Sequence, residues 1–433
     1  MNIMTTGKEC PVTIHDYGCG YGKTTMMIEG FRDDERYLVI VPYLSEVTRV
    51  IENAEVPFFE PETNNCGATK LDSLRDLAFR GENIVTTHAM FYSLVDVARE
   101  GLLRSYRIII DEVVDPLKAL GRTPGNFAWE DIYIGNEYVT VNEFGFVTPS
   151  QKWLQNREAL KHDLNDLVLN AALNGCLYVH KGTTFIWCLP VELLLAGRSL
   201  DVYTYHAEGS ALRSYLKKLG VQPSIITDTA YDQGFRARTR DLLTIKDLTI
   251  TTSSPKGPPK PVSFSFSGQD KHSKTEMKAV ALALKKLSRS DLKDVPAGEV
   301  LITCAKENWY HNGIGPNDLT GASRKPKAAG FAIDSRLFEK AVWIPNTTRG
   351  TNAYAEASHL IYLYDKNFNP VIYQWLLEGE PKETVNRMLD HFAVAEFIQW
   401  LYRSRIRKGE PVTLYVASPR MRALLEQWMV GEL

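Results

Sequence analysis

The sequence lacks the features that would place it among zinc proteins, membrane proteins or strongly basic proteins. Its six cysteines are scattered and form no Cys-x-x-Cys pair, so a zinc site is unsupported and reduced thiols are expected. No apolar run is long enough to cross a bilayer and no basic-plus-apolar leader occurs, which predicts a cytoplasmic protein with no membrane partner. The formal net charge of −2 excludes a globally basic nucleic-acid binder, although it is compatible with a local basic groove.

The composition is that of a globular protein with a substantial core. Of the 433 residues, 44% are hydrophobic and 24% are charged, and this length accommodates two or three domains. The chain also contains no internal repeat, coiled coil or low-complexity tract.

Apolar segments rich in β-branched residues alternate with helical patterns along the first half of the chain. Continuous apolar runs of this kind predict a parallel sheet that is covered on both faces. We expect strands at 12–15, 37–41, 83–87, 107–111, 184–188 and 201–204, and helices at about 45–53 and 89–98. Residues 126–147 show short alternation and predict a β-hairpin insert, which continues into a helix at 153–174.

A second α/β series follows a proline-rich stretch. We expect a helix at about 275–287 and strands at 299–303, 341–345, 359–363 and 412–416. The predicted organisation is therefore two α/β lobes with parallel sheets, residues 1–250 and 263–433. The first lobe carries a small insert at about 126–175, and residues 251–262 form the linker between the lobes.

The most informative segment is a glycine-rich turn between the first strand and the first helical pattern. It reads Asp16-Tyr-Gly-Cys-Gly-Tyr-Gly-Lys-Thr-Thr25 and ends in Gly-Lys-Thr where a helix begins. In a phosphate-binding loop of this kind, backbone N–H groups cradle phosphates, the lysine reaches the β/γ oxygens and the next hydroxyl ligates Mg²⁺. The predicted binding residues are Gly18, Gly20, Gly22, Lys23, Thr24 and Thr25. Tyr17 replaces the glycine that usually opens this pattern, and an ordinary glycine-rich βα turn is the alternative interpretation.

An apolar strand that ends in two acids supplies the second half of a nucleotide site. In Ile108-Ile-Ile-Asp-Glu-Val-Val114, Asp111 is predicted to hold Mg²⁺ and Glu112 to orient or deprotonate an attacking water. Alone, such a strand is more often a capped βα turn. Together with Lys23 and Thr24, it predicts an ATP-hydrolysing site with Mg²⁺ as cofactor.

Other strand ends and one arginine cluster are candidates for contacts with nucleic acid or phosphate. Loops at the carboxyl ends of parallel strands line the ligand crevice of a doubly wound sheet, and hydroxyls there suit phosphodiester oxygens. The candidates for strand contacts are Pro42, Thr86, Thr87, His88, Arg349, Thr351 and Asn352. A helix N-cap with a satisfied histidine is the alternative for 86–88. Gln399, Arg403, Arg405 and Arg407 form a cluster that suits an arginine finger, with a solvated basic helix end as the alternative.

In order, these motifs resemble those of superfamily 2 helicases of the DEAD/DEAH-like class. Residues 20–24 resemble motif I, 41–42 motif Ia, 86–88 motif Ib, 111–114 motif II, 301–304 motif IV, 349–352 motif V and 399–405 motif VI. The segment 204–210 occupies the place of motif III but lacks Ser-Ala-Thr, and Tyr402 stands where motif VI usually has glycine. The segments 399–407 and 415–421 are most similar to helicases of tailed-bacteriophage replication modules, and more distantly to herpesvirus origin-binding helicases.

The resemblance implies two tandem RecA-like domains that form an ATP-driven helicase or translocase. It implies single-stranded or forked nucleic acid as partner, with DNA favoured but RNA still open, and replication proteins as further candidate partners. If the protein is viral, the expected location is the host cytoplasm. Catalytic roles would fall to Lys23, Glu112, Gln399, Arg403 and Arg405, and the finger is Arg403, Arg405 or Arg407. Two other functions remain open, a remodelling ATPase that binds strands without unwinding them and a packaging ATPase. The dispersed carboxylates after residue 262 disfavour the packaging ATPase.

Overall fold

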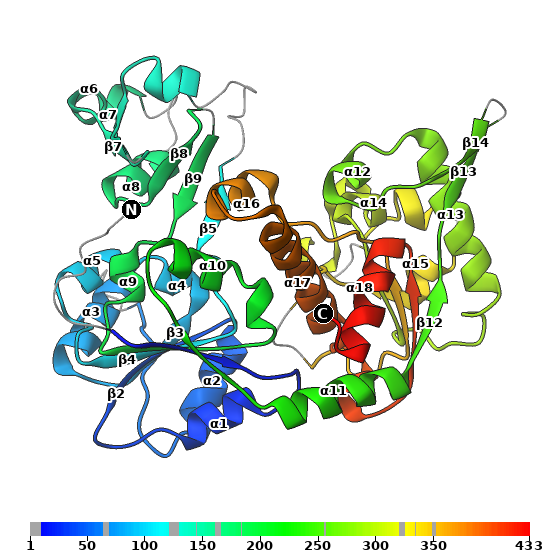
Figure 1. Cartoon of the computed structure of the whole chain (residues 1–433), viewed down its shortest axis with the longest axis horizontal. Coiled ribbons are helices and arrows are strands. Elements are labelled where there is room, and N and C mark those ends of the chain that lie inside the picture. The colour runs from blue at the N-terminus through cyan, green and yellow to red at the C-terminus, as the bar shows by residue number, and fades with distance from the viewer. Residues whose placement is uncertain are drawn as a thin grey trace. The chain divides into compact units, whose positions relative to one another are not determined.

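The computed structural model describes residues 10–63, 69–120, 130–143, 145–160, 166–182, 184–254, 257–319, 325–333, 335–348 and 352–433 (Figure 1). Its contacts divide the chain into two compact units. Unit 1 comprises Met1–Tyr17, Tyr21–Thr227 and Phe368–Met388, and unit 2 comprises Gly18–Gly20, Asp228–Asn367 and Leu389–Leu433. No helix in the described ranges has both the length and the apolar character that a membrane crossing needs.

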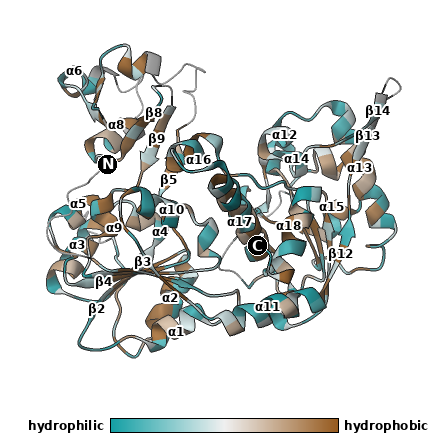
Figure 2. Ribbon diagram, in the orientation of Figure 1, coloured by the Kyte–Doolittle hydropathy of each residue, from teal (hydrophilic) through white to brown (hydrophobic). Residues whose placement is uncertain are grey.

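Unit 1 is built on a six-stranded parallel sheet with the order β11-β1-β10-β4-β2-β3. Its strands are β1 (Val12–Asp16), β2 (Arg36–Val41), β3 (Ile84–Thr87), β4 (Tyr106–Asp111), β10 (Ser199–Thr204) and β11 (Ser224–Thr227). Helices α1 (Lys23–Glu29), α2 (Leu44–Asn53), α3 (Lys70–Arg80), α4 (His88–Phe91), α5 (Val95–Arg99), α9 (Val191–Leu194) and α10 (Ala211–Lys218) connect the strands. Figure 2 colours the central strands mainly as hydrophobic, which agrees with their burial on both faces.

A separate small core forms the insert of unit 1. It contains a three-stranded antiparallel sheet, β5-β9-β8, and a hairpin, β6-β7. The elements are β5 (Leu117–Ala119), η1 (Glu130–Ile134), β6 (Val139–Val141), β7 (Val147–Pro149), α6 (Gln151–Gln155), α7 (Arg157–Leu160), α8 (Asp166–Leu173), β8 (Leu177–His180) and β9 (Thr184–Cys188). Tyr133, Trp153, Leu169 and Phe185 pack together at its centre. The strand expected at 184–188 is therefore present but belongs to this sheet, because its partners are antiparallel neighbours rather than the parallel strands.

Unit 2 contains a five-stranded parallel sheet with the order β12-β18-β17-β15-β16. Its strands are β12 (Leu243–Asp247), β15 (Val300–Thr303), β16 (Ala341–Trp343), β17 (His359–Tyr362) and β18 (Val412–Val416). The larger helices are α11 (Thr229–Leu242), α13 (Lys274–Arg289) and α18 (Pro419–Val430), with α12 (Phe266–Asp270), α14 (Lys306–Trp309) and α15 (Leu337–Lys340) between them. With the sheet of unit 1, this sheet confirms the predicted fold class of two tandem RecA-like domains.

The proline-rich segment predicted to be a linker has regular structure. Strands β13 (Thr251–Ser254) and β14 (Gly257–Pro261) pair as an antiparallel hairpin with an irregular register. Prolines tolerate this position because a two-stranded ribbon leaves outward-facing edges that need no N–H donor. The first change of unit after the phosphate loop instead falls between Thr227 and Asp228.

A segment from late in the chain belongs to unit 1. It contains α16 (Pro370–Leu376) and the start of α17 (Lys382–Leu401). The buried ring of Trp375 lies between the rings of Tyr178 and Tyr215, with centroid distances of 5.0 and 6.2 Å, and the Lys218 ammonium lies 4.9 Å from its centre. Aromatic packing of this kind anchors the segment to the insert and to α10.

Candidate nucleotide site

The glycine-rich turn has the backbone that a phosphate loop requires. Gly20 and Gly22 adopt left-handed conformations with φ of 83° and 89°, which cost little only for glycine. Gly22 is the N-cap of α1 and supplies no side-chain cap, so the first N–H groups of the helix point into the loop. Gly18 is required for a different reason, since a Cβ there would lie 2.9 Å from the Tyr231 ring. The predicted loop residues therefore have the expected local geometry.

Lys23 and Thr24 form hydrogen bonds with different partners. The Lys23 ammonium, only 9% exposed, donates to the Tyr17 carbonyl at 3.0 Å. The Thr24 hydroxyl donates to Oδ2 of Asp111 at 2.8 Å, which joins the two predicted motifs directly. The adjacent Thr25 hydroxyl accepts from Arg49 at 3.1 Å. The Tyr17 and Tyr21 rings stack at 4.3 Å, so the residue that replaces the usual glycine packs against the loop itself.

Asp111 at the end of β4 is buried, and the next residue, Glu112, is half-buried. Burial, followed by the charge of Glu112, raises the pKa of Asp111 to about 6, and the Thr24 hydrogen bond and Lys23 oppose that rise. Glu112 is one of few non-glycine residues with positive φ (63°), and its N–H donates to Tyr203 O at 2.9 Å. Its Oε2 is buried and has no hydrogen-bond partner among the described residues. A strained backbone and an unsatisfied buried oxygen both fit a carboxylate that awaits a ligand.

These residues fit a magnesium ion, which would be held by Thr24 and Asp111. Hydroxyl and carboxylate oxygens are the donors that Mg²⁺ prefers, and a cation there would relieve the repulsion between Asp111 and Glu112. When bound, the ion would screen the negative charge of nucleotide phosphates.

The strand ends predicted to contact nucleic acid differ in exposure. Thr86 lies within β3 and is 4% exposed, so its side chain is removed from solvent. Thr87 and His88 are half-buried, and the His88 ring lies 3.0 Å from the Asp111 carbonyl. Pro42 is half-buried and precedes two exposed residues, Tyr43 and Leu44.

The predicted residues of unit 2 are partly described. Arg349 and Thr351 lie outside the described residues, and Asn352 is exposed. Gln399 is buried, and its Oε1 has no hydrogen-bond partner in the described part of the chain. Arg403 is 4% exposed and donates from Nε to the Gln399 carbonyl at 2.9 Å. Arg405 is half-buried and donates to Pro411 O at 2.7 Å, whereas Arg407 is exposed.

Tyr402 and the phosphate loop both contact α11 within unit 2. The Tyr402 hydroxyl lies 2.5 Å from the Thr239 hydroxyl, and the Tyr231 hydroxyl donates to the Cys19 carbonyl at 3.4 Å. Tyr402 therefore fills a packed position, which explains why this chain can carry an aromatic residue where the resembling motif has glycine.

The structure adds a residue that sequence reasoning missed. Asp16 ends β1, and its carboxylate accepts from the backbone N–H groups of His206 and Ala207 at 2.6 and 2.8 Å. An acid before the glycine-rich turn was visible in the sequence. Its partners stand 190 residues away, and no local pattern indicates them.

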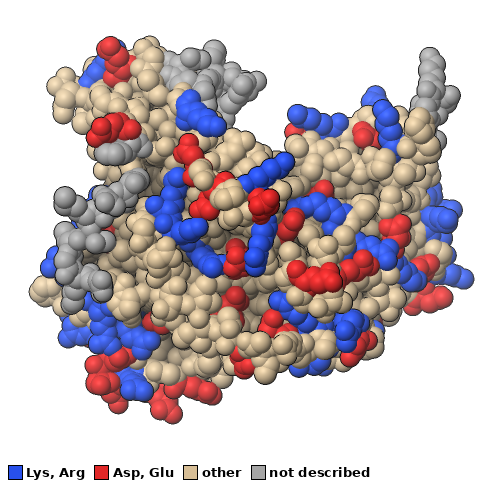
Figure 3. All heavy atoms as spheres, in the orientation of Figure 1, with Lys and Arg blue, Asp and Glu red and all other residues tan. Residues whose placement is uncertain are grey.

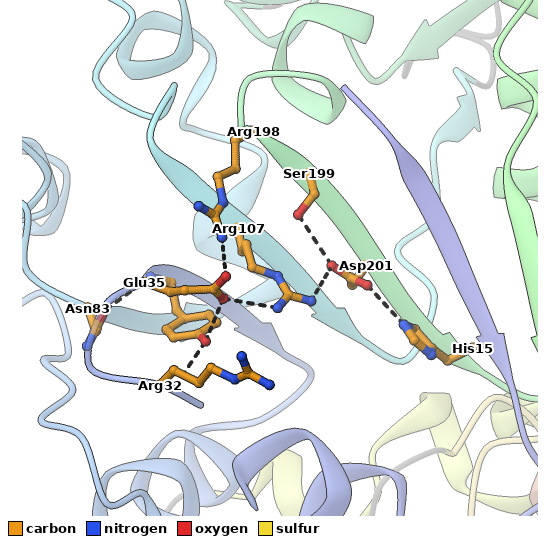
Figure 4. A network of polar contacts seen from close by, with 9 residues as sticks. His15, Arg32, Glu35, Asn83, Arg107, Arg198, Ser199 and Asp201 are labelled. Carbon is orange, nitrogen blue, oxygen red and sulfur yellow. Dashed lines mark hydrogen bonds and ion pairs between the residues drawn. The ribbon is translucent and has the colours of Figure 1, made fainter. Parts of the chain in front are cut away.

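A polar network near the amino ends of β4 and β10 was also missed (Figure 4). Arg107 donates to Glu35 at 3.0 Å and to Asp201 at 3.1 Å, and the His15 ring lies 2.9 Å from Asp201. Arg198 forms an ion pair with the same Glu35. Burial acts to raise the pKa of Asp201, but the bonds to His15 and Arg107 hold it below its ordinary value. The network lies away from Lys23 and Asp111 along the sheet, and we interpret it as structural.

The fold and the loop define a protein with two tandem RecA-like domains, of which the first has a phosphate-loop geometry. Residues 237–429 match the family model described as the YonV C-terminal Rossmann-like domain. The chain is 25% identical to the SPbeta prophage-derived uncharacterized protein YonV of Bacillus subtilis (strain 168), over 97% of this chain and 99% of the relative.

The solved structures that match this chain include helicases. An XPD helicase matches 98% of this chain and 95% of its own, with 12% identity and a TM-score of 0.49. Xpd4 of S. tokodaii matches 96% and 94%, with 12% identity and a TM-score of 0.48. S. cerevisiae Dbp5 bound to RNA and ADP BeF3 matches 98% and 84%, with 12% identity and a TM-score of 0.41.

Proposed function

We propose that this chain is an ATP-dependent nucleic-acid motor, a helicase or translocase that uses Mg-ATP and acts in phage DNA replication or recombination. The observation that carries the proposal is the hydrogen bond from Thr24 to Asp111, next to Glu112, whose Oε2 has no hydrogen-bond partner among the residues that the structure describes. It supports a site in which a phosphate loop and an acidic strand end act on the same nucleotide. The similarity to a prophage-derived protein supports the phage context.

Within this proposal each residue of the first domain has a distinct task. The loop from Gly18 to Thr25 binds the phosphates through its amides, and Lys23 leaves the Tyr17 carbonyl to neutralise the γ-phosphate. Glu112 accepts a proton from the attacking water or orients it, because its buried Oε2 accepts no hydrogen bond from the described part of the chain. Asp111 and Thr24 hold the cation.

The second domain is proposed to contribute the finger and part of the strand path. Gln399 and Arg403 or Arg405 would stabilise charge on the transferring phosphoryl group. Nucleic acid, single-stranded or forked and preferably DNA, would contact Pro42, Thr87 and His88 in the first domain. Arg349, Thr351 and Asn352 would supply contacts from the second.

The test is an ATPase assay with and without single-stranded DNA, RNA and duplex DNA, alongside unwinding of a labelled fork. Stimulation by a strand together with fork unwinding supports the motor. Absence of ATP hydrolysis under every condition contradicts it.

A remodelling ATPase is the second candidate, and one observation favours it. The segment 204–210 lacks Ser-Ala-Thr, and its backbone is instead held by the carboxylate of Asp16. Strand-stimulated hydrolysis without unwinding is the outcome expected for this candidate.

A further inference from the structure

The carboxylate of Asp16 connects the segments that follow strands β1 and β10. The parallel pairing of the two strands alone would not connect these segments. Register places Asp16 opposite Thr204, and the Tyr17 N–H donates to the Thr204 carbonyl at 3.0 Å. Beyond this point the two segments separate. One continues into the phosphate loop and the other continues toward α10. The two bonds from His206 and Ala207 to Asp16 hold them together where the ladder ends.

His206 has the conformation that makes this contact possible. Its φ of 61° and ψ of 57° are left-handed, a conformation that is unfavourable for residues other than glycine. This conformation directs two successive N–H groups toward one point, an arrangement that binds anions. The carboxylate of Asp16 occupies that point, and bonds from N–H groups to an ionised acceptor are stronger than neutral ones.

The held segment continues directly into a helix that contacts the late part of unit 1. The short helix η2 (Ala207–Gly209) is followed by Ser210, whose hydroxyl accepts from the Arg213 N–H and caps α10. Tyr215 and Lys218 of α10 lie against the Trp375 ring, and Lys217 donates to Glu380 at 2.8 Å. A shift at His206 would therefore displace α10 and, through it, the segment Phe368–Met388 that contains Trp375.

There is room for such a shift. A cavity of about 440 Å³ separates α10 from residues 376–388, and its walls carry both basic and acidic side chains. Figure 3 shows the two kinds of charge side by side over α10 and α16. An open, charged boundary can rearrange more readily than a close-packed apolar one.

We propose that Asp16 is a positioning residue that transmits the state of the phosphate loop to α10 and the segment Phe368–Met388. The inference rests on the proposed nucleotide site. Lys23 donates to the Tyr17 carbonyl in the structure, and its transfer to a bound phosphate would remove this hydrogen bond from the residue next to Asp16. Because Asp16 binds both His206 and Ala207, a backbone change at this point moves the start of η2.

The test is amide hydrogen exchange of the full chain with and without MgADP, read over residues 206–218. The wild type should show a change on MgADP binding. Asp16→Asn keeps the size of the side chain but places an NH₂ group against one N–H, so the change should fall at least about five-fold, the lower range for coupled sites. Asp201→Asn, which removes a buried carboxylate of the same sheet that does not contact the loop, should retain the wild-type change.

Calorimetric titration with MgADP separates the possible failures. Asp16→Asn should bind MgADP within about three-fold of the wild type, since the coupling rather than the phosphate contacts is removed. Failure of the wild type to bind MgADP overturns the proposed function and this inference with it. Binding without any change at 206–218, or an undiminished change in Asp16→Asn, overturns the inference alone. A wild type that binds MgADP without any change at 206–218 overturns the inference even if the variant does not fold.

Discussion

Thr24 and Asp111 stand 87 residues apart, and the hydroxyl of one donates to the carboxylate of the other at 2.8 Å. The contact exists because β1 and β4 are parallel and flank β10 in the sheet, which brings the carboxyl ends of both strands to one edge. Two patterns that are individually ambiguous in the sequence thereby become one site.

Lys23→Ala should lower kcat/KM for ATP by about 10²–10³-fold, as expected for the loss of a group that stabilises developing charge. The reason is that Lys23 is the buried lysine of the loop, and its ammonium group lies where it can reach a bound phosphate once it leaves the Tyr17 carbonyl. Steady-state ATPase measurements check this, with Lys70→Ala on exposed α3 as control. Equal rates for Lys23→Ala and the wild type would refute the assignment.

Glu112→Gln should reduce turnover by about 10²–10⁴-fold, the usual contribution of a general base, while ATP binding persists. The amide matches the size of the carboxylate but accepts a proton poorly, and it removes the negative charge beside Asp111. Single-turnover kinetics and nucleotide titration separate the two effects. The control is Glu29→Gln at the end of α1, and normal hydrolysis by Glu112→Gln would show that another group is the base.

Arg405→Ala should slow hydrolysis by about 10³-fold, the lower range for an arginine finger, without altering the melting temperature much. Arg405 is half-buried, with its hydrogen bond to the Pro411 carbonyl near the surface. Arg403→Ala should also destabilise the fold, because that side chain is buried against Gln399. Parallel ATPase and thermal unfolding measurements, with Arg407→Ala included, identify the finger. A full rate in all three variants would remove the role from this segment.

The network around Asp201 predicts acid lability of unit 1. The folded-state pKa of Asp201 lies below its ordinary 3.8, so the stabilisation is complete above about pH 4 and is lost as pH falls through the lower folded value. The contribution is about 1.5–3 kcal/mol, as for buried hydrogen bonds to charged groups. Urea unfolding from pH 6 to 3 should show a steeper loss in the wild type than in Asp201→Asn. Parallel curves would contradict this account.

Tyr402→Phe should cost about 1 kcal/mol in unfolding free energy, because the Thr239 hydroxyl loses a buried partner but keeps its bond to the Phe235 carbonyl. Denaturant unfolding measures the change, and Tyr43→Phe at an exposed position is the matched control. A cost equal to that of the control would show that the hydroxyl contact contributes nothing.

Local patterns predicted most of the two parallel sheets, and the failures have a common cause. The strands at 37–41 and 107–111 are long apolar runs, and the structure contains both. Residues 184–188 have the same character, yet they pair in an antiparallel sheet, because strand partners are chosen over long distances. The prolines of 251–262 suggested a linker, although a hairpin edge accommodates them equally well.

The residues of the candidate site likewise divide into those that local sequence predicted and those that depend on tertiary packing. The turn ending in Gly22, Lys23 and Thr24 could be predicted from the sequence. The backbone freedom of glycine and the start of a helix both depend on a few adjacent residues. The exposure of Thr86 and Thr87 could not be predicted from the sequence. Alternate residues of a strand face opposite sides of the sheet, and the packing around β3 decides which of the two side chains is buried.

The amino-acid sequence by itself determined the chemistry available to this protein: a glycine-rich turn before a lysine, two acids after an apolar strand, and an arginine cluster near its end. Tertiary structure alone decided that Thr24 bonds Asp111 and that Asp16 binds His206 and Ala207. It also decided that Glu112 keeps a buried oxygen with no partner among the described residues. The physical reason is the distance along the chain over which each kind of interaction acts. Backbone preference acts between neighbours, whereas burial and hydrogen bonding are settled only when strands distant in the chain come together.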